Sequence, residues 1–324
     1  MRIVSLLPSA TEVLFALGLG DEVVGVSHEC DFPPEARSRR VVIHSRLPHE
    51  ATPGEIDRLV REYVGRGESL YSVDTEALRE LRPDLLVTQD LCHVCAASPD
   101  DLATALTEFE RRPQVLCLNP QDLGDVWRDV LWVGEETGRG HEAEALLEKI
   151  GERLGRIESQ VEHVEHRPRV AFLEWLEPFY VGGHWVPEMI EFAGGKDVLG
   201  KQRTPSFRVT AEEVIAADPE VLLIAQCGYT ATQARDEYNT MAFPEEWNEI
   251  AAVRHSHVYA LEATNYFSRP GPRLITGIET LASILHRGFP VDAEARRAVL
   301  PITVSSGSAA HPRAATVRAA TNQL

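Results

Sequence analysis

The chain has 324 residues, of which 44% are hydrophobic and 25% charged, a balance typical of globular domains with buried cores. Its net charge of −18 argues against nucleic-acid binding, because no cationic surface would be left to neutralise phosphates. No apolar run is long enough to span a membrane, and the five cysteines do not suggest a disulfide framework.

The N-terminus, MRIVSLLPSATE, enters predicted structure at once. It has no basic segment, apolar stretch and cleavage site in series, so a signal peptide is not indicated. We therefore expect a cytoplasmic protein, or a periplasmic or surface-exposed one if a leader has been removed.

Short β-rich runs alternate with helical patterns, which predicts an α/β fold. The runs are apolar and β-branched without alternation, as is typical of strands buried on both faces of a parallel sheet. The predicted strands are Ile3–Leu7, Val23–Ser27, Leu85–Gln89, Val115–Asn119, Val170–Leu173, Leu222–Gln226 and Val258–Leu261. Two of the intervening helices have capping-box spacing at their starts, Ser9 with Glu12 and Thr210 with Glu213.

An internal repeat relates the two halves of the chain. VDTEALRELRPDLLV, from Val73, aligns without gaps with VTAEEVIAADPEVLL, from Val209. Each copy is typical of a capped helix, a proline break and a buried strand. The openings RIVSLL and RVAFLE fall in similar relative places, so we predict two related Rossmann-like lobes with mostly parallel sheets.

Between the repeats, from Asp122 to Glu165, helix breakers are almost absent and apolar residues recur at helical spacing, with Gly138 and Gly140 as a place for a break. After Pro290 the chain becomes rich in Ala, Ser and Thr. We predict a first lobe over 1–121, a connecting helix over 122–166, a second lobe over 167–290 and a loosely ordered tail over 291–324.

Several stretches occur in a familiar order. Pro8, Thr11 and Glu12 form a Pro-x-x-Thr-Glu turn, VGVS follows at 24–27, and DFPP at 31–34. LRPDLLVTQ, EFAGGKDVLG, RTPSFRVTAEEVIAADPEVLLIA and TNYFSRPGPRLI come later. Together, over roughly residues 2 to 288, they resemble the vitamin B12-binding family of periplasmic-binding-protein-like domains.

This resemblance implies a helical-backbone (class III) ABC transporter substrate-binding domain without a catalytic cofactor. Such a protein holds a corrinoid such as cobalamin edge-on between two lobes and can deliver it to a membrane permease. The chain departs from the family at Ser206, where relatives have tryptophan, and at Asn265, where they have aspartate.

In parallel sheets, ligands collect beyond the carboxyl ends of the strands, so we expect one cleft lined by the loops that follow them. A corrinoid is a flat apolar ring edged with amides, and it requires aromatic surface with matching donors and acceptors. The candidate ligand-binding residues are Pro8, Ser9, Asp31, Gln89, Cys92, His93, Trp175, Tyr180, Phe207, Tyr229, Asn265, Tyr266 and Arg269.

The loop DLCHVCAAS, residues 90–98, contains Cys92 and Cys95 with His93 between them. With Cys30 these residues are ligands that zinc accepts, but structural zinc sites usually have a second cysteine pair. A redox pair is expected at a helix N-terminus after a strand, a setting that TQD before the loop does not match closely. We interpret the loop as a pocket wall, with metal ligation by Cys30, Cys92 and Cys95, or a redox role, as alternatives.

The sequence contains no enzyme signature. No phosphate-binding loop or Gly-x-Ser-x-Gly elbow occurs, and Glu174, Glu177 and Glu262 are too dispersed for an acid/base pair. Alternative functions are a haem- or ferric-siderophore-binding protein, or a metal- or redox-active protein that uses the cysteine cluster. Siderophore sites tend to use arginines, and the expected cleft offers few beyond Arg203, Arg208 and Arg269.

Overall fold

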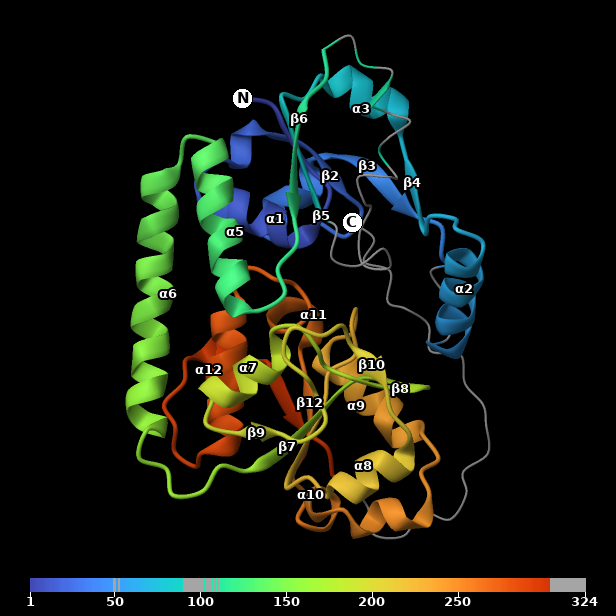
Figure 1. Cartoon of the computed structure of the whole chain (residues 1–324), viewed down its shortest axis with the longest axis vertical. Coiled ribbons are helices and arrows are strands. Elements are labelled where there is room, and N and C mark those ends of the chain that lie inside the picture. The colour runs from blue at the N-terminus through green and yellow to red at the C-terminus, as the bar shows by residue number, and fades with distance from the viewer. Residues whose placement is uncertain are drawn as a thin grey trace.

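The computed structural model describes residues 1–48, 51, 53–89, 102, 106–107, 109 and 111–303. Its two β-sheets lie in two lobes, one above the other, with α5 and α6 along one side (Figure 1). Apolar clusters cover both faces of each sheet. This arrangement is the predicted α/β fold of two sheets with a helical backbone.

The first lobe has its sheet in the order β4-β3-β2-β1-β5-β6 within the described residues. All neighbours pair in parallel except β3 and β4. The strands are β1 (Ile3–Ser5), β2 (Val23–Ser27), β3 (Arg40–Ser45), β4 (Tyr71–Val73), β5 (Leu85–Gln89) and β6 (Gln114–Leu118). The helices are α1 (Pro8–Ala16), α2 (Pro53–Gly65) and α3 (Thr75–Leu81).

The second lobe has the order β10-β8-β7-β11-β12-β13, with β9 beside β7. Its strands are β7 (Arg169–Leu176), β8 (Phe179–Val181), β9 (Lys196–Asp197), β10 (Phe207–Arg208), β11 (Val221–Ile224), β12 (Val258–Leu261) and β13 (Val299–Pro301). Its helices are α7 (Val186–Phe192), α8 (Ala211–Ala217), α9 (Ala231–Thr240), α10 (Ala251–Arg254), α11 (Ala263–Tyr266), α12 (Leu274–Leu285) and α13 (Ala293–Arg297).

Each of the seven predicted strands corresponds to an observed one, and their mutual pairings are parallel. The sequence did not predict β3, β9 or the short antiparallel strands β4, β8, β10 and β13. Apart from β3, which has six residues, these strands are two or three residues long and carry partly exposed side chains, so they lack the long apolar run that marks a central strand.

One of the two predicted capping boxes is wrong. The box of Thr210 with Glu213 is confirmed, because each side chain accepts the backbone N–H of the other residue, at 3.2 and 2.7 Å. Helix α1 instead begins at Pro8, with Leu7 as its uncapped N-cap, so Ser9 lies inside the first turn. Proline is pre-organised for the first helical position, which starts the helix before Ser9 can cap it.

The repeat is visible as matching local structure at the starts of both sheets. The Arg2 backbone N–H donates to the Asp84 carboxylate at 2.8 Å, and the Arg169 N–H donates to the Glu220 carboxylate at 2.9 Å. In return, the N–H groups of Asp84 and Glu220 donate to the two arginine carbonyls. The same reciprocal pairing therefore joins β1 to β5 and β7 to β11.

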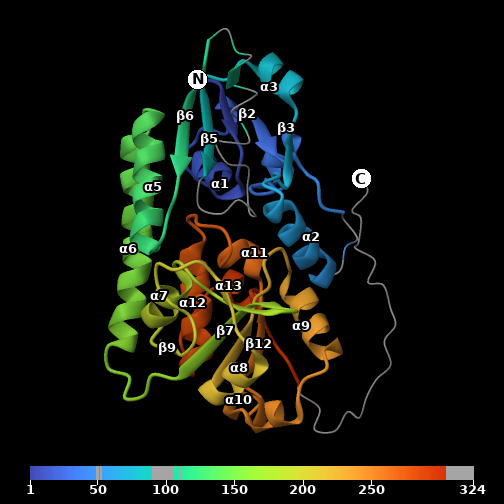
Figure 2. The same cartoon turned by 45° about the vertical axis from the view of Figure 1, so that its right-hand side comes forward.

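Helices α5 (Leu123–Glu136) and α6 (Gly140–Val161) are separated at Gly138, whose φ of +70° suits glycine. Helix α6 runs beside both lobes in two views (Figures 1 and 2). Its Ala143 belongs to the core of the first lobe, and its Ile157 to that of the second. No helix in the described ranges combines the length and apolarity that a membrane crossing requires.

The expectation of a loose tail from residue 291 is wrong for its first part. Helix α13 and strand β13 follow Pro290, and β13 pairs antiparallel with β12. Ala295, Ala298 and Ile302 are buried there, which the small-residue composition did not reveal. The remaining residues of the predicted tail, 304–324, lie outside the described residues.

Candidate functional site

The segments that follow the carboxyl ends of the strands in the two lobes meet through a cluster of ion pairs, which we call the central cluster (Glu12, Asp31, Arg269 and Arg273). The Arg273 guanidinium donates to both Glu12 carboxylate oxygens, at 2.8 and 2.5 Å. Arg269 donates to Asp31 at 2.5 Å and lies 3.6 Å from Glu12. Because Glu12 and Asp31 come from the first lobe and both arginines from the second, the cluster joins the lobes.

Burial dominates the electrostatics of the central cluster. The Glu12 side chain is only 3% exposed, and this burial raises the pKa of its carboxyl group, although Arg273 acts in the opposite direction. For Arg269, burial acts to lower the pKa, but the hydrogen bond and charge of Asp31 leave it raised. Each charge thus depends on its partner, as expected for ions removed from water.

Several predicted ligand residues lie at this junction, but their polar groups already have partners. Asp31 and Arg269 bind each other. Asn265 donates to Glu262 at 3.1 Å, and Tyr266, 8% exposed, donates its hydroxyl to Glu294 at 2.9 Å. Pro8 and Ser9 are buried in the first turn of α1.

Two further ion pairs join the lobes. Arg208 of β10 donates to Asp57 of α2 at 2.6 Å. Arg203, which precedes β10, pairs with Asp122, the N-cap of α5, and lies 3.8 Å from Asp125. In these pairs and in the central cluster, the arginine comes from the second lobe, and the carboxylate comes from the first lobe or α5.

Predicted aromatic residues line the strand ends of the second lobe. Trp175 of β7 and Tyr229, which follows β11, are half-buried and meet edge to face at 5.9 Å between ring centroids. Tyr180 carries the Arg208 guanidinium 5.4 Å above its ring and accepts a hydrogen bond from it at 2.9 Å. Phe207 has the Lys201 ammonium 5.1 Å from its ring.

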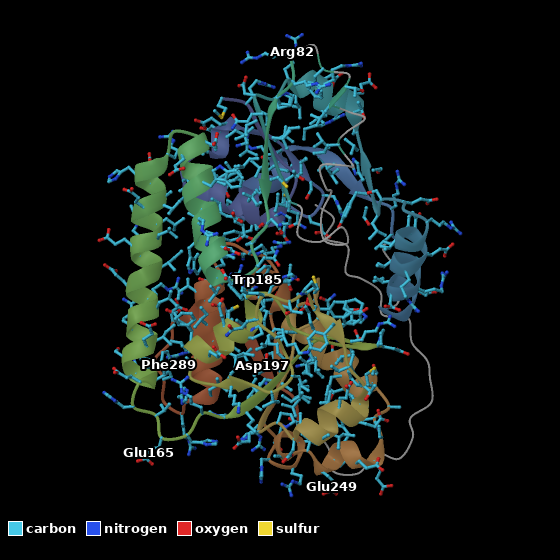
Figure 3. The ribbon with its side chains drawn as sticks, viewed as in Figure 1. Arg82, Glu165, Trp185, Asp197, Glu249 and Phe289 are labelled. Carbon is cyan, nitrogen blue, oxygen red and sulfur yellow. The ribbon has the colours of Figure 1, made fainter. Side chains whose placement is uncertain are left out.

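Two titratable groups at the aromatic pair, which are hydrogen-bonded to each other, have raised pKa values. Burial raises the pKa of the Tyr229 phenol and, on α9, that of the Glu237 carboxyl group. Ser206 donates to Glu174 at 2.7 Å. Trp185, labelled in Figure 3 near the middle of the molecule, donates to the Phe267 carbonyl at 2.8 Å.

The cysteine cluster is only partly described. Cys30 is 3% exposed, its sulfur accepts a hydrogen bond from Thr11 at 3.0 Å, and burial raises the pKa of its thiol. Cys92, His93 and Cys95 lie outside the described residues, and Gln89 is buried at the end of β5 just before them. Among the residues that the structure describes, no three His, Cys, Asp or Glu side chains are grouped to hold a metal. The metal site of Cys30, Cys92 and Cys95 therefore stays a prediction.

From the sequence, Asp31 and Arg269 are predicted ligand-binding residues and Arg203 and Arg208 lie in the expected cleft, but none of them is predicted to join the lobes. Glu12 belongs to the Pro-x-x-Thr-Glu motif and to the capping-box spacing with Ser9, and both indicate the start of a helix rather than an interlobe ion pair. Asp57 lies in α2 among charged residues at helical spacing, as on any solvated face. Arg273 lies in the stretch TNYFSRPGPRLI, but its position there does not indicate a partner in the first lobe.

A pocket of about 790 Å³ lies elsewhere, between α6 and α7. It is lined by polar and acidic side chains that include Glu158, Glu162 and Glu191. It contains none of the predicted ligand-binding residues.

Comparison with known proteins identifies a family and several relatives. Residues 3–264 match the family model described as "Periplasmic binding protein". The chain is 25% identical over 280 residues to a vitamin B12-binding protein of Vibrio parahaemolyticus, covering 86% of both chains. It is 26% identical over 294 residues to an uncharacterised ABC transporter substrate-binding lipoprotein of Bacillus subtilis, covering 88% of this chain and 80% of the relative.

Solved structures support the fold. A periplasmic haem-binding protein from Pseudomonas aeruginosa superposes with a TM-score of 0.71, covering 94% of this chain and 99% of that one. The sequences are 19% identical, so the likeness concerns the fold.

Proposed function

The chain belongs to the periplasmic binding protein family, and from this premise we propose that it is the substrate-binding protein of an ABC-type uptake system, with a corrinoid held between its lobes. The Vibrio parahaemolyticus relative is named as a vitamin B12-binding protein, and vitamin B12 is a corrinoid. The alignment covers 86% of both chains. The proposal includes an ABC permease as partner and a site of action outside the cytoplasm.

The observation that carries the choice of ligand is the neutralisation of the arginines at the junction. Arg203, Arg208, Arg269 and Arg273 each face a carboxylate of the first lobe or α5. Haem carries two propionates and many ferric siderophores are anionic, so such ligands would have to displace these carboxylates. A corrinoid ring edged with neutral amides needs no free cation.

The aromatic residues of the second lobe support the same ligand. Trp175 and Tyr229 present half-buried rings beside each other, and neither ring is stacked face to face with the other. A flat apolar macrocycle gains stability from contact with such rings, while side-chain and backbone polar groups at the strand ends bind its amides.

Calorimetric titration of the protein with hydroxocobalamin, hemin and a ferric hydroxamate tests the proposal. We expect saturable one-to-one binding of hydroxocobalamin at micromolar protein, with weaker or no binding of the two other chelates. Trp175→Ala and Tyr229→Ala should each weaken the binding about tenfold, since losing such a ring contact costs about 1–2 kcal/mol. Trp132→Ala is the matched control, because Trp132 is 40% exposed on α5. Absence of heat with several cobalamins, or tighter binding of hemin, would refute the proposal.

A further inference from the structure

We propose that helix α2 is a gate at the side of the interlobe junction opposite α5 and α6, and that the Asp57–Arg208 ion pair is its latch. Helix α2 belongs to the first lobe and extends toward the second lobe in both views (Figures 1 and 2). The two residues are 151 positions apart in the chain, and their side chains meet at 2.6 Å.

The latch is more exposed than the Glu12–Arg273 pair of the central cluster. Arg208 is 43% exposed and Asp57 11%, close to the 39% and 11% of Asp31 and Arg269, whereas Glu12 and Arg273 are 3% and 12% exposed. A buried pair is expensive to break, but a partly exposed one is worth little and is screened by salt. The Glu12–Arg273 pair is therefore suited to a permanent joint, and the latch to repeated opening.

Three contacts place the Arg208 side chain at one position. Its Nη2 donates to Asp57 and its Nε donates to the Tyr180 hydroxyl at 2.9 Å, while the guanidinium lies over the Tyr180 ring. Asp57 also binds Arg61 within α2, at 2.6 Å. When the latch breaks, Asp57 keeps this second partner and Arg208 keeps Tyr180, so opening leaves neither charge alone.

The helix itself is amphipathic and lightly held. Its apolar residues Ile56, Leu59, Val60 and Tyr63 are only half-buried, although Val60 and Tyr63 pack against the core of the first lobe. Since α6 joins both lobes as one rigid helix, access to the junction by hinge bending is restricted. Displacement of α2 alone requires little loss of core contact, and we assign the control of ligand entry to it.

Hydrogen exchange without ligand tests the latch independently of the proposed function. Amide exchange of residues 53–65 is measured by mass spectrometry in the wild type, in Asp57→Asn and in Arg208→Gln. We expect amide exchange to be about two- to fivefold faster in both variants, because a partly exposed ion pair stabilises the closed position of α2 by less than about 1 kcal/mol. Arg203→Gln is the control, because Arg203 is also an exposed interlobe arginine but pairs with Asp122 at the start of α5. This variant should leave the amide exchange of residues 53–65 unchanged. Unchanged exchange in both latch variants would overturn the proposal.

A measurement of binding kinetics, which rests on the proposed corrinoid binding, distinguishes a gate from a ligand contact. For hydroxocobalamin, opening the gate should raise the association and dissociation rates by similar factors in Asp57→Asn and leave Kd nearly unchanged. The charge exchange Asp57→Arg with Arg208→Asp should restore slow rates. A variant that raises only the dissociation rate would make Asp57 a ligand contact and refute the gate. If hydroxocobalamin does not bind at all, the corrinoid proposal fails while the exchange result still decides the latch.

Discussion

Arg273, at the N-cap of α12, holds the Glu12 carboxylate of α1 through two hydrogen bonds across 261 residues of chain. The Phe32 ring lies 3.9 Å from the same guanidinium. Two charges are thus removed from water where the lobes meet, and each is stable only while the other is present.

Breaking this pair should destabilise the protein strongly. We expect Arg273→Gln to lower the free energy of unfolding by about 3 kcal/mol, because it leaves the Glu12 carboxylate buried without its main partner. Urea denaturation followed by circular dichroism measures the change. Arg66→Gln, which removes an exposed pair with Glu62, should cost less than about 0.5 kcal/mol. If the double variant with Glu12→Gln costs as much as the two single changes added together, the two residues are not coupled.

Asp197, labelled in Figure 3, should make stability depend on pH. Its Oδ1 accepts N–H groups of Leu199 and Gly200, its Oδ2 is buried without a described partner, and burial raises the pKa of this carboxyl group to about 6. The folded state then binds this proton more tightly than the unfolded chain does, so the contribution of Asp197 to stability is greatest below about pH 4 and is lost as the pH rises through about 6.

Asp197→Asn keeps the accepting oxygen and removes the titration. Its stability relative to the wild type should therefore increase by about 2 kcal/mol between pH 4 and pH 7. Urea unfolding of both proteins at several pH values gives this difference. A difference that stays constant with pH would contradict the prediction.

Gly183 should tolerate no side chain. A Cβ there would lie 2.2 Å from the Thr204 carbonyl oxygen and 2.6 Å from the Ser206 nitrogen, so the segment before β10 would have to move. We expect Gly183→Ala to cost about 2 kcal/mol in thermal or urea unfolding. Gly151→Ala in α6 is the matched control, because its Cβ meets no atom within 4 Å, and it should stabilise by up to about 1 kcal/mol. Equal effects would show that the segment adapts freely.

The lobes should move little relative to each other on ligand binding. Helix α6 has 22 residues, or about 33 Å at the α-helical rise, and Arg153 ties it to Glu279 of α12 at 2.7 Å. Small-angle scattering profiles with and without hydroxocobalamin should nearly superimpose. A marked fall in the radius of gyration would reveal a hinge that this helix does not prevent.

Replacing Cys92 and Cys95 together with serine tests their expected role as a pocket wall. We expect hydroxocobalamin binding to weaken modestly and the visible spectrum of the complex to stay almost unchanged. A large spectral shift would instead indicate that a thiolate binds the cobalt, since a soft ligand suits its open axial position.

The local elements could be predicted from the sequence because their signals are local. Leu85–Gln89 and Val258–Leu261 are apolar runs that match β5 and β12, and Thr210 with Glu213 forms the box that its spacing indicates. The repeat also predicted a capped helix followed by a buried strand in each half, and these are α3 with β5 and α8 with β11. Such features depend on a few neighbouring residues, which fold in the same way wherever the segment lies.

The partners of the charged side chains could be decided only by the tertiary structure. In the sequence, Asp57 looks like any residue of a solvated surface, Glu12 is a candidate for a helix cap, and Arg208 and Arg269 look free to bind a ligand. The sheet topology brings the carboxyl ends of both sets of strands together, so carboxylates of the first lobe meet arginines of the second. An ion pair between distant residues forms only where the fold brings the two side chains together and excludes water around them. The spacing of residues in the sequence contains neither piece of information.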